Sequence, residues 1–312
     1  MEMLDRKRGA LIGLAIGDAL GAPIDLQLPG DFPAVTGFQA GGRFDLEPGE
    51  WANHTSMALA LADSIATSGW GLNDQARRYL AWWKEGKYTA RGHAFFVGST
   101  IKESLARFLD TGYALAAGDR AEESSSSGPI TRLAPVVIRY AEFFPKRPEH
   151  MIGLAIDSSL PTHASPQCLS ACGYLGLVLC GLVDGIDRET VLSPNWEPLR
   201  KLNEVHALHP EVADVAAGSF RCQKCPSIVG SSYVVKSLEA ALWAFYDAAD
   251  FRQAVLRAVN LGDDSDAVGA ICGQLAGAWW GESGIPLVWR QSLAHSDMIE
   301  QALQRLLQGA TG

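Results

Sequence analysis

The sequence has little that would suit it to binding nucleic acid or crossing a membrane. Its 26 basic residues are outnumbered by 35 acidic ones, and the resulting charge of −9 disfavours contact with a phosphate backbone. The apolar run at 267–280 contains Gln274 and is shorter than the roughly 20 residues that a membrane span requires. We therefore expect no nucleic-acid partner and no membrane partner.

The sequence also lacks a recognisable secretion signal. The segment Asp5-Arg-Lys-Arg8 leads into only a short apolar run, which Asp18 interrupts. Four of the six cysteines fall within apolar helical patterns that are typical of reduced core residues, namely Cys168, Cys172, Cys180 and Cys272. Together these features predict a cytoplasmic protein.

A second cysteine pair to match Cys222-Gln-Lys-Cys225 is absent as well. This spacing occurs in half a zinc site or in a redox pair, but no strand-to-helix pattern surrounds it. We expect a loop with two thiols, and a zinc or redox function is the less favoured alternative.

No segment alternates apolar and polar residues as a strand would, and no linker or repeat of roughly 20 to 50 residues divides the chain. Apolar residues recur instead at helical spacing. We expect an all-α fold in a single compact multi-helix domain over residues 1–312. The predicted helices include 6–20, 55–67, 74–85, 132–140, 166–182, 237–248 and 297–308.

Particular residues predict where helices begin and where they cannot form. We expect N-caps at Asn73, Ser165, Asp250 and Ser296, and a capping box formed by Thr100 with Glu103. Three segments lack helical spacing, and we expect a long loop at 24–50, irregular structure at 195–230 and a flexible loop, which could act as a lid, at 121–128.

Glycines recur at every fourth position in two segments. Because residues four apart lie on one face of a helix, each set forms a stripe, comprising Gly9, Gly13, Gly17 and Gly21 in one segment and Gly269, Gly273, Gly277 and Gly281 in the other. Glycine inside a helix costs about 1 kcal/mol relative to alanine. We expect the two stripes to pack closely against each other.

Three acids, Asp263, Asp264 and Asp266, precede the second glycine-rich helix. Their oxygens can converge on one point, where the positive end of the helix helps to hold negative charge. Either they bind a metal or a substrate hydroxyl, or they only stabilise the start of the helix.

Several segments, taken in order, resemble the ADP-ribosylglycohydrolase family, near its bacterial dinitrogenase-reductase-activating branch. The resemblance covers about residues 6–292. It rests on Gly9-Ala-Leu-Ile-Gly-Leu-Ala-Ile-Gly-Asp-Ala-Leu-Gly-Ala-Pro23, Thr55-Ser-Met-Ala-Leu-Ala-Leu-Ala62, Arg132-Leu-Ala-Pro135, Thr162-His163, Ser237-Leu-Glu-Ala-Ala-Leu-Trp-Ala-Phe245 and the stretch 258–281.

The resemblance implies an all-α domain with two magnesium ions in a cleft, where water cleaves a ribosyl glycosidic bond. The usual metal ligands of the family are a Thr-Asp-Asp run before the second helix and an Asp-x-Asp-Thr run before the late glycine-rich helix. Magnesium prefers octahedral oxygen ligands, and carboxylates stabilise the oxocarbenium-like state of such cleavage.

The chain departs from this pattern at the metal ligands. Ala52-Asn53-His54 replaces the first run, and Ala267 replaces the last threonine of the second. Imidazole is a poor magnesium ligand. We therefore expect a weakened or absent magnesium site with Asp264 and Asp266 as its remaining ligands.

The resemblance nevertheless implies a candidate site. Its catalytic residues would be Asp25, Asp264 and Asp266. Its substrate-binding residues would be Asn53, His54, Phe96, Gly98, Ser99, Ser127, Gly128, His163, Ser231 and Tyr233. His54 could instead cap a helix, His163 could be a structural loop residue, and Asp25 could be a solvated loop acid.

Two functions remain open on the sequence alone. One is a hydrolase of a ribosyl bond, acting on an ADP-ribosylated substrate or a small NAD-derived nucleotide. The other is an inactive module of the same fold that binds a ligand or supports a structure. The surviving carboxylates favour the hydrolase, and the altered metal runs favour the inactive module.

Overall fold

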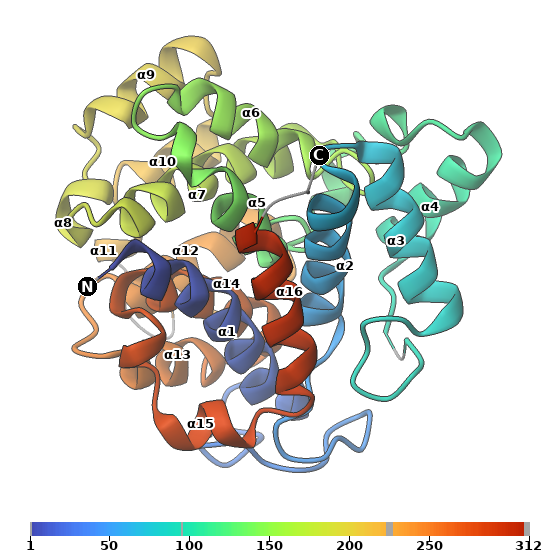
Figure 1. Ribbon diagram of the computed structural model, residues 1–312. Coiled ribbons are helices and arrows are strands. Elements are labelled where there is room, and N and C mark those ends of the chain that lie inside the picture. The colour runs from blue at the N-terminus through green and yellow to red at the C-terminus, as the bar shows by residue number, and fades with distance from the viewer. Residues whose placement is uncertain (1, 95, 223–226, 309–312) are drawn as a thin grey trace.

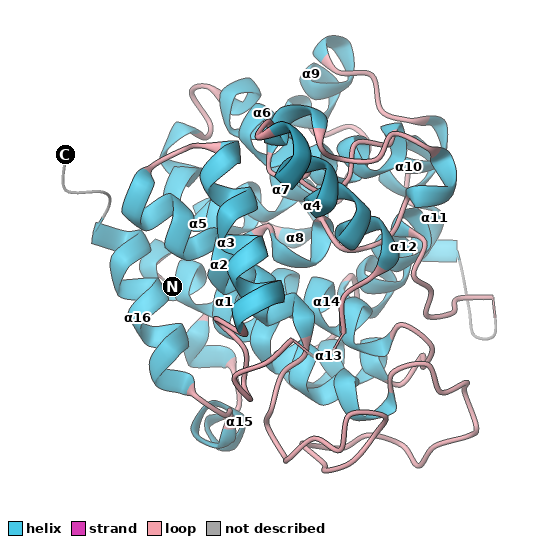
Figure 2. Cartoon of the chain, turned by 90° about the vertical axis from the view of Figure 1, so that its right-hand side faces the viewer, coloured by secondary structure: helices cyan, strands magenta, loops and turns pink. Residues whose placement is uncertain are grey.

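The computed structural model describes residues 2–94, 96–222 and 227–308. Throughout these residues the chain forms α-helices and short 3-10 turns, and it contains isolated bridges but no strand (Figures 1 and 2). The predicted all-α fold is therefore confirmed.

The α-helices follow one another along the chain, with loops of varied length between them. They are α1 (Met3–Gly21), α2 (Asn53–Ser68), α3 (Leu72–Glu85), α4 (Ser99–Thr111), α5 (Ala134–Tyr140), α6 (Pro148–Asp157), α7 (Pro166–Asp184), α8 (Arg188–Val191), α9 (Glu197–Val205), α10 (Pro210–Ala216), α11 (Ser219–Cys222), α12 (Val234–Phe245), α13 (Phe251–Val259), α14 (Ser265–Trp280), α15 (Leu287–Ser292) and α16 (Ser296–Gln308).

Helices α1 and α14 lie side by side at the centre of the fold (Figure 1). Their glycine stripes face each other so closely that a Cβ atom added to Gly17 would overlap the carbonyl oxygen of Gly269, and one added to Gly13 would overlap that of Gly273. The prediction that the two stripes pack together is confirmed. The absence of side chains lets the two backbones touch.

The central pair is surrounded by other helices that bury its remaining faces. Helices α2, α5, α7, α12 and α13 all pack against α1 or α14. Helix α7 is long and apolar enough to span a membrane by composition, but 83% of its most apolar window is buried inside the fold. Its apolar surface therefore forms part of the core. Cys168, Cys172, Cys180 and Cys272 are buried free thiols, as predicted.

Some predicted helix ends are confirmed and others are wrong. Ser165 caps α7 by accepting from Cys168 N at 3.3 Å, and Asp250 caps α13 by accepting from Gln253 N at 2.7 Å. Asn73 lies inside α3, because its side chain accepts instead from Ala114 N at 2.9 Å.

The predicted capping box and the prediction at Ser296 also differ from the structure. Helix α4 begins after Gly98 with no side-chain cap, so Thr100 and Glu103 already lie inside it. Ser296 is the first residue of α16. Gly98 precedes α4 with a φ of −59° and a ψ of 151°, a conformation that any residue can adopt.

The prediction of irregular structure at 195–230 was wrong in part. Helices α9, α10 and α11 lie there, and both α9 and α10 carry a proline in their first turn. Proline stabilises that position because its fixed φ suits a helix start and its missing N–H is not needed there. Cys222 is exposed at the end of α11, and Cys225 lies outside the described residues.

Substituting Gly17 tests the contact between α1 and α14. Gly17→Ala should lower the free energy of unfolding by about 2 kcal/mol or more, because the added methyl group would force two backbones apart. Gly153→Ala provides a matched control in α6, where a Cβ atom would meet no atom within 4 Å. That variant should be more stable by up to about 1 kcal/mol. Denaturant unfolding measures both, and equal stability of Gly17→Ala and the wild type would contradict the contact.

Candidate active site

Asp18 connects the central helix pair to α2. It lies fully buried near the end of α1 and accepts hydrogen bonds from Ala52 N at 3.1 Å and from the N and Oγ1 atoms of Thr55 at 2.7 Å. These donors lie at the start of α2, so the carboxylate caps that helix from a distance. Burial raises the pKa of Asp18 to about 6, opposed by the charge of His54 and the bonds from Thr55.

A reciprocal pair of backbone hydrogen bonds places Asp25 beside the start of α14. Leu26 N donates to Asp263 O at 2.8 Å, and Asp263 N donates to Gln27 O at 2.7 Å. Leu26 and Asp263 both have a positive φ, which is uncommon outside glycine. The two unusual turns bring Asp25 close to Asp264.

The three predicted catalytic carboxylates meet at one point. Asp25, Asp264 and Asp266 each offer an oxygen, and these oxygens all lie within 4.8 Å of one another. Burial, followed by the charge of Asp266, raises the pKa of Asp25 to about 8 and that of Asp264 to about 7. Asp264 accepts from Ser127 Oγ at 3.0 Å. The start of α14, where Ala267 N donates to Asp266 Oδ1 at 2.8 Å, lies beside this cluster and favours negative charge.

His54 supplies positive charge to the cluster. Thr131 Oγ1 donates to Gly128 O at 2.9 Å, so it accepts from His54 Nδ1, which lies 3.0 Å away. His54 Nε2 faces Asp266 Oδ2 at 3.6 Å. Both ring nitrogens therefore face acceptors, which favours the doubly protonated imidazolium. Burial alone would lower the pKa of His54, but the carboxylates Asp266, Asp18 and Asp264 raise it to about 9.

The residues present suit one divalent cation better than two. Asp25, Asp264 and Asp266 form an all-oxygen set of the kind that magnesium prefers. On the side of α2, Ala52 offers no ligand atom and His54 presents an N–H group toward Asp266. Asn53 Oδ1 is buried with no hydrogen-bond partner among the described residues, but it is a single neutral oxygen.

The serine run at 124–127 is tied into the site and is not the flexible loop that we predicted. Ser125 Oγ lies 2.8 Å from Ser165 Oγ, Ser126 Oγ lies 2.7 Å from His163 Nε2, and Ser127 donates to Asp264. The composition of the run concealed these bonds, because each partner comes from a distant part of the chain.

His163 is a buried structural residue of this loop. Its Nδ1 lies 2.9 Å from Thr162 Oγ1, and its Nε2 contacts Ser126. Thr162 also accepts from Arg132 Nη2 at 2.6 Å. Burial and the charge of Arg132 lower the pKa of His163 to about 3. The imidazole is therefore neutral and holds the loop through hydrogen bonds on both ring nitrogens.

The other predicted substrate-binding residues lie on segments other than those that carry the three acids. Phe96 and Asn53 line one narrow crevice that is too small to hold a water molecule. Gly98 and Ser99 form the start of α4 and make no hydrogen bond with the acids among the residues described. Ser231 and Tyr233 lie where the chain pairs with the serine run, since Ser126 and Tyr233 form a bridge, while the Tyr233 hydroxyl donates to Glu211 at 2.9 Å.

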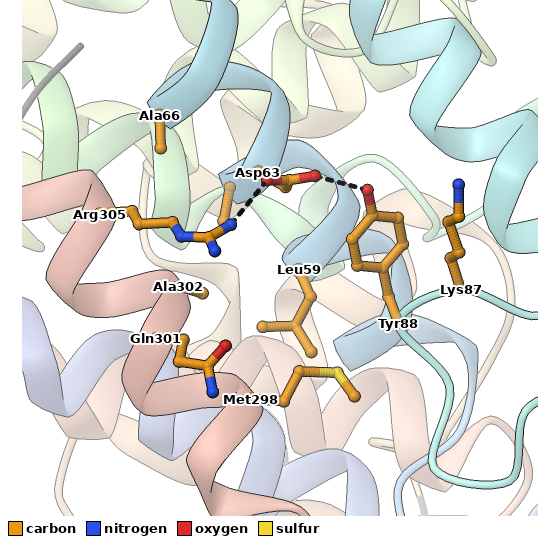
Figure 3. A pocket seen from close by; sticks show the side chains of 10 residues that line it. Leu59, Asp63, Ala66, Lys87, Tyr88, Met298, Gln301, Ala302 and Arg305 are labelled. Atoms are coloured by element: carbon orange, nitrogen blue, oxygen red, sulfur yellow. Dashed lines mark hydrogen bonds and ion pairs between the residues drawn. The ribbon is translucent and has the colours of Figure 1, made fainter. Parts of the chain in front are cut away.

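A second, larger cavity lies apart from the acids, between α2 and α16. It has a volume of about 220 Å³ and opens to solvent (Figure 3). Its acid, Asp63, accepts from Tyr88 at 2.7 Å, from Arg78 at 2.6 Å and from Arg305 at 3.4 Å. These partners satisfy the Asp63 carboxylate.

Sequence reasoning missed Asp18, Thr131 and Arg43 as parts of this site. Arg43 Nη1 lies 3.4 Å from Asp25 Oδ2. Asp18 could have been found, because a lone acid within a buried apolar helix needs partners. Thr131 and Arg43 carry no comparable signal, since their roles depend on contacts between distant segments.

The neutral, buried state of His163 predicts a pH effect on stability. A histidine whose pKa falls from 6.5 to about 3 on folding stabilises the protein above pH 6.5 and loses that contribution as the pH falls. The free energy of unfolding falls by at most about 1.4 kcal/mol for each pH unit.

His163→Gln should remove this effect. The variant should be less stable than the wild type near neutrality, and denaturant unfolding should show the difference narrowing between about pH 6.5 and about pH 4. A difference that stays constant over this range would mean that His163 is not held neutral.

A model of the ADP-ribosylglycohydrolase family matches residues 1–312. The chain is 36% identical over 306 residues to the ADP-ribosylarginine hydrolase Tri1 of Serratia proteamaculans, covering 98% of this chain and 80% of the relative. It is 35% identical to the protein of that name from Pseudomonas putida, covering 99% of this chain and 80% of the relative.

Two further comparisons agree with these. The chain is 27% identical to the ADP-ribosyl-[dinitrogen reductase] glycohydrolase of Rhodospirillum rubrum, covering 96% of this chain and 94% of the relative. A solved structure described as an ADP-ribosylglycohydrolase-related protein complex superposes with a TM-score of 0.84 at 36% identity, covering 98% of each chain.

Proposed function

Because the chain belongs to the ADP-ribosylglycohydrolase family, a family of glycosidic hydrolases, we propose that it releases ADP-ribose from arginine side chains of modified proteins. The observation that carries the proposal is the convergence of Asp25, Asp264 and Asp266 within 4.8 Å. The arginine linkage is supported by two relatives, at 36% and 35% identity, which are named ADP-ribosylarginine hydrolases.

The reaction breaks the bond between the anomeric carbon of the ribose and a guanidine nitrogen, and water adds to that carbon. Positive charge develops on the ribose ring in the transition state, and the carboxylates of Asp25, Asp264 and Asp266 stabilise it. A carboxylate accepts a proton from the water, and the departing guanidine nitrogen must gain one.

The same three acids would hold one divalent cation, with the buried Asn53 oxygen nearby. When bound, such a cation orients ribose hydroxyls and neutralises negative charge in the cluster. The His54 imidazolium would stand where a second cation would otherwise balance Asp266. We propose that a protein cation has replaced one metal ion, and that the usual two-magnesium site is thereby reduced to one ion.

Removing one carboxylate tests the proposed hydrolysis. Asp266→Asn should lower the rate of release of ADP-ribose from an ADP-ribosyl-arginine peptide by about 100-fold or more, because it removes charge that stabilises the transition state. Asp31→Asn is the matched control, because Asp31 is an exposed acid in the same loop as Asp25. No turnover by the wild type, with or without magnesium, would refute the proposed function and favour an inactive module.

Counting bound ions tests the proposed metal site independently of turnover. Calorimetric titration with Mn²⁺ should give one ion per wild-type chain and much weaker binding in Asp264→Asn, which loses a ligand of that ion. A variant that combines Asn53→Asp with His54→Asp should bind a second ion, because two carboxylates would replace an amide and a cation. Two ions bound by the wild type would contradict the replacement by His54.

A further inference from the structure

A short turn holds an arginine beside the acid cluster. Gly41 and Leu46 exchange two backbone hydrogen bonds, of 2.8 and 2.9 Å, so that residues 42–45 form a tight turn. Gly42 has a φ of 73° and lies so close to Pro23 that a Cβ atom would overlap the proline carbonyl. The turn therefore has one side fixed against the start of the long loop, close to Asp25.

A second arginine fixes the other side of this turn. Arg91 donates to Phe44 O at 3.1 Å and to Asp45 O at 2.6 Å, and it forms an ion pair with Glu50 at 2.6 Å. Leu46 is buried beneath the turn. The backbone that carries Arg43 and Phe44 is thus held by contacts on both sides of the turn.

The Arg43 guanidinium lies beside two aromatic rings and a carboxylate. Its central carbon is 4.7 Å from the centre of the Phe44 ring and 5.2 Å from that of Phe96, and its Nη1 is 3.4 Å from Asp25 Oδ2. The two rings are 6.3 Å apart and inclined at 49°. Ring faces together with a carboxylate are the groups that bind a guanidinium.

We propose that Asp25, Phe44 and Phe96 form the subsite for the guanidinium of a substrate arginine, and that Arg43 occupies this subsite in the free protein. The inference rests on the proposed function, because it gives the leaving group a place beside the reactive carboxylates. Two guanidinium groups repel each other and cannot share these rings. The Arg43 side chain, which is 38% exposed, swings out toward solvent when the substrate enters.

This arrangement makes Arg43 a competitor of the substrate and a source of selectivity. A leaving group without positive charge, such as a serine side chain, has neither the charge nor the flat surface that is needed to displace Arg43. Asp25 is about 7% exposed, so solvent screens its charge only weakly from a guanidinium beside the rings. The subsite therefore favours arginine over lysine, whose ammonium group has no flat face.

Binding of small arginine compounds tests the subsite without any turnover. The probes are Nα-acetyl-arginine amide, Nα-acetyl-lysine amide and ADP-ribose, measured by ligand-observed NMR titration. Arg43→Gln should tighten binding of the arginine compound by about fivefold, because it removes a competing ion pair and two ring contacts. Binding of ADP-ribose should stay within about twofold.

A second variant supplies the matched control. Adding Phe96→Leu to Arg43→Gln keeps an apolar side chain but removes a ring face, and it should weaken arginine binding by about threefold or more. The lysine compound should bind more weakly than the arginine compound to every protein that has both rings. Both substitutions lie at the surface, and circular dichroism checks that each variant is folded.

Two results would overturn the proposal. If Arg43→Gln leaves arginine binding unchanged and weakens ADP-ribose binding, then Arg43 binds a phosphate and does not occupy a leaving-group subsite. If the arginine and lysine compounds bind equally, the rings do not recognise a guanidinium. Turnover is measured separately. If the protein shows the predicted order of affinities but does not hydrolyse ADP-ribosyl-arginine, the proposed function is refuted and the subsite stands.

Discussion

The backbone contact between α1 and α14 is the constraint on which the site depends. The stripe at Gly9, Gly13 and Gly17 faces the stripe at Gly269, Gly273 and Gly277, and no side chain separates them. Asp18 follows one stripe directly, and Asp266 precedes the other by three residues. The contact therefore brings a buried acid of α1 and the acids at the start of α14 into one small region.

Bringing several acids together creates an excess of negative charge that the protein must balance. Among the described residues, three sets of contacts provide this balance. The start of α2 donates hydrogen bonds to Asp18, His54 carries a proton beside Asp266, and Arg43 lies beside Asp25. In the family pattern much of this balance would come from two metal ions. In this chain Asn53, an amide, and His54, a cation, stand where the family pattern has two metal-binding carboxylates. Fewer metal ions are then needed to balance the negative charge.

The balance of charge around Asp25 also affects which substrate binds. Arg43 and a substrate arginine carry the same group, and both suit the rings of Phe44 and Phe96. A protein that neutralises its own acids with a guanidinium has thereby formed a surface that fits its proposed leaving group. Charge balance and selectivity then depend on one carboxylate, Asp25.

Local patterns predicted the parts of the structure that depend on spacing along one segment. The packing of the glycine stripes followed from their period of four, and the cluster at Asp264 and Asp266 followed from its place before a helix. The helices within 195–230 were missed because Pro198 and Pro210 looked like helix breakers, although each stands in a first turn. The bonds of His54 to Thr131 and of Ser126 to His163 join segments that are far apart in sequence, so no local pattern reveals them.

The central claim is that this fold holds one cation among Asp25, Asp264 and Asp266, with His54 in place of another. A crystal structure of the protein with Mn²⁺ and ADP-ribose tests it most directly, since an anomalous difference map locates each ion. We predict one peak among the three carboxylates, in contact with the ribose, and none beside His54. Two peaks, or an ion bound directly to His54 Nε2, would contradict the account.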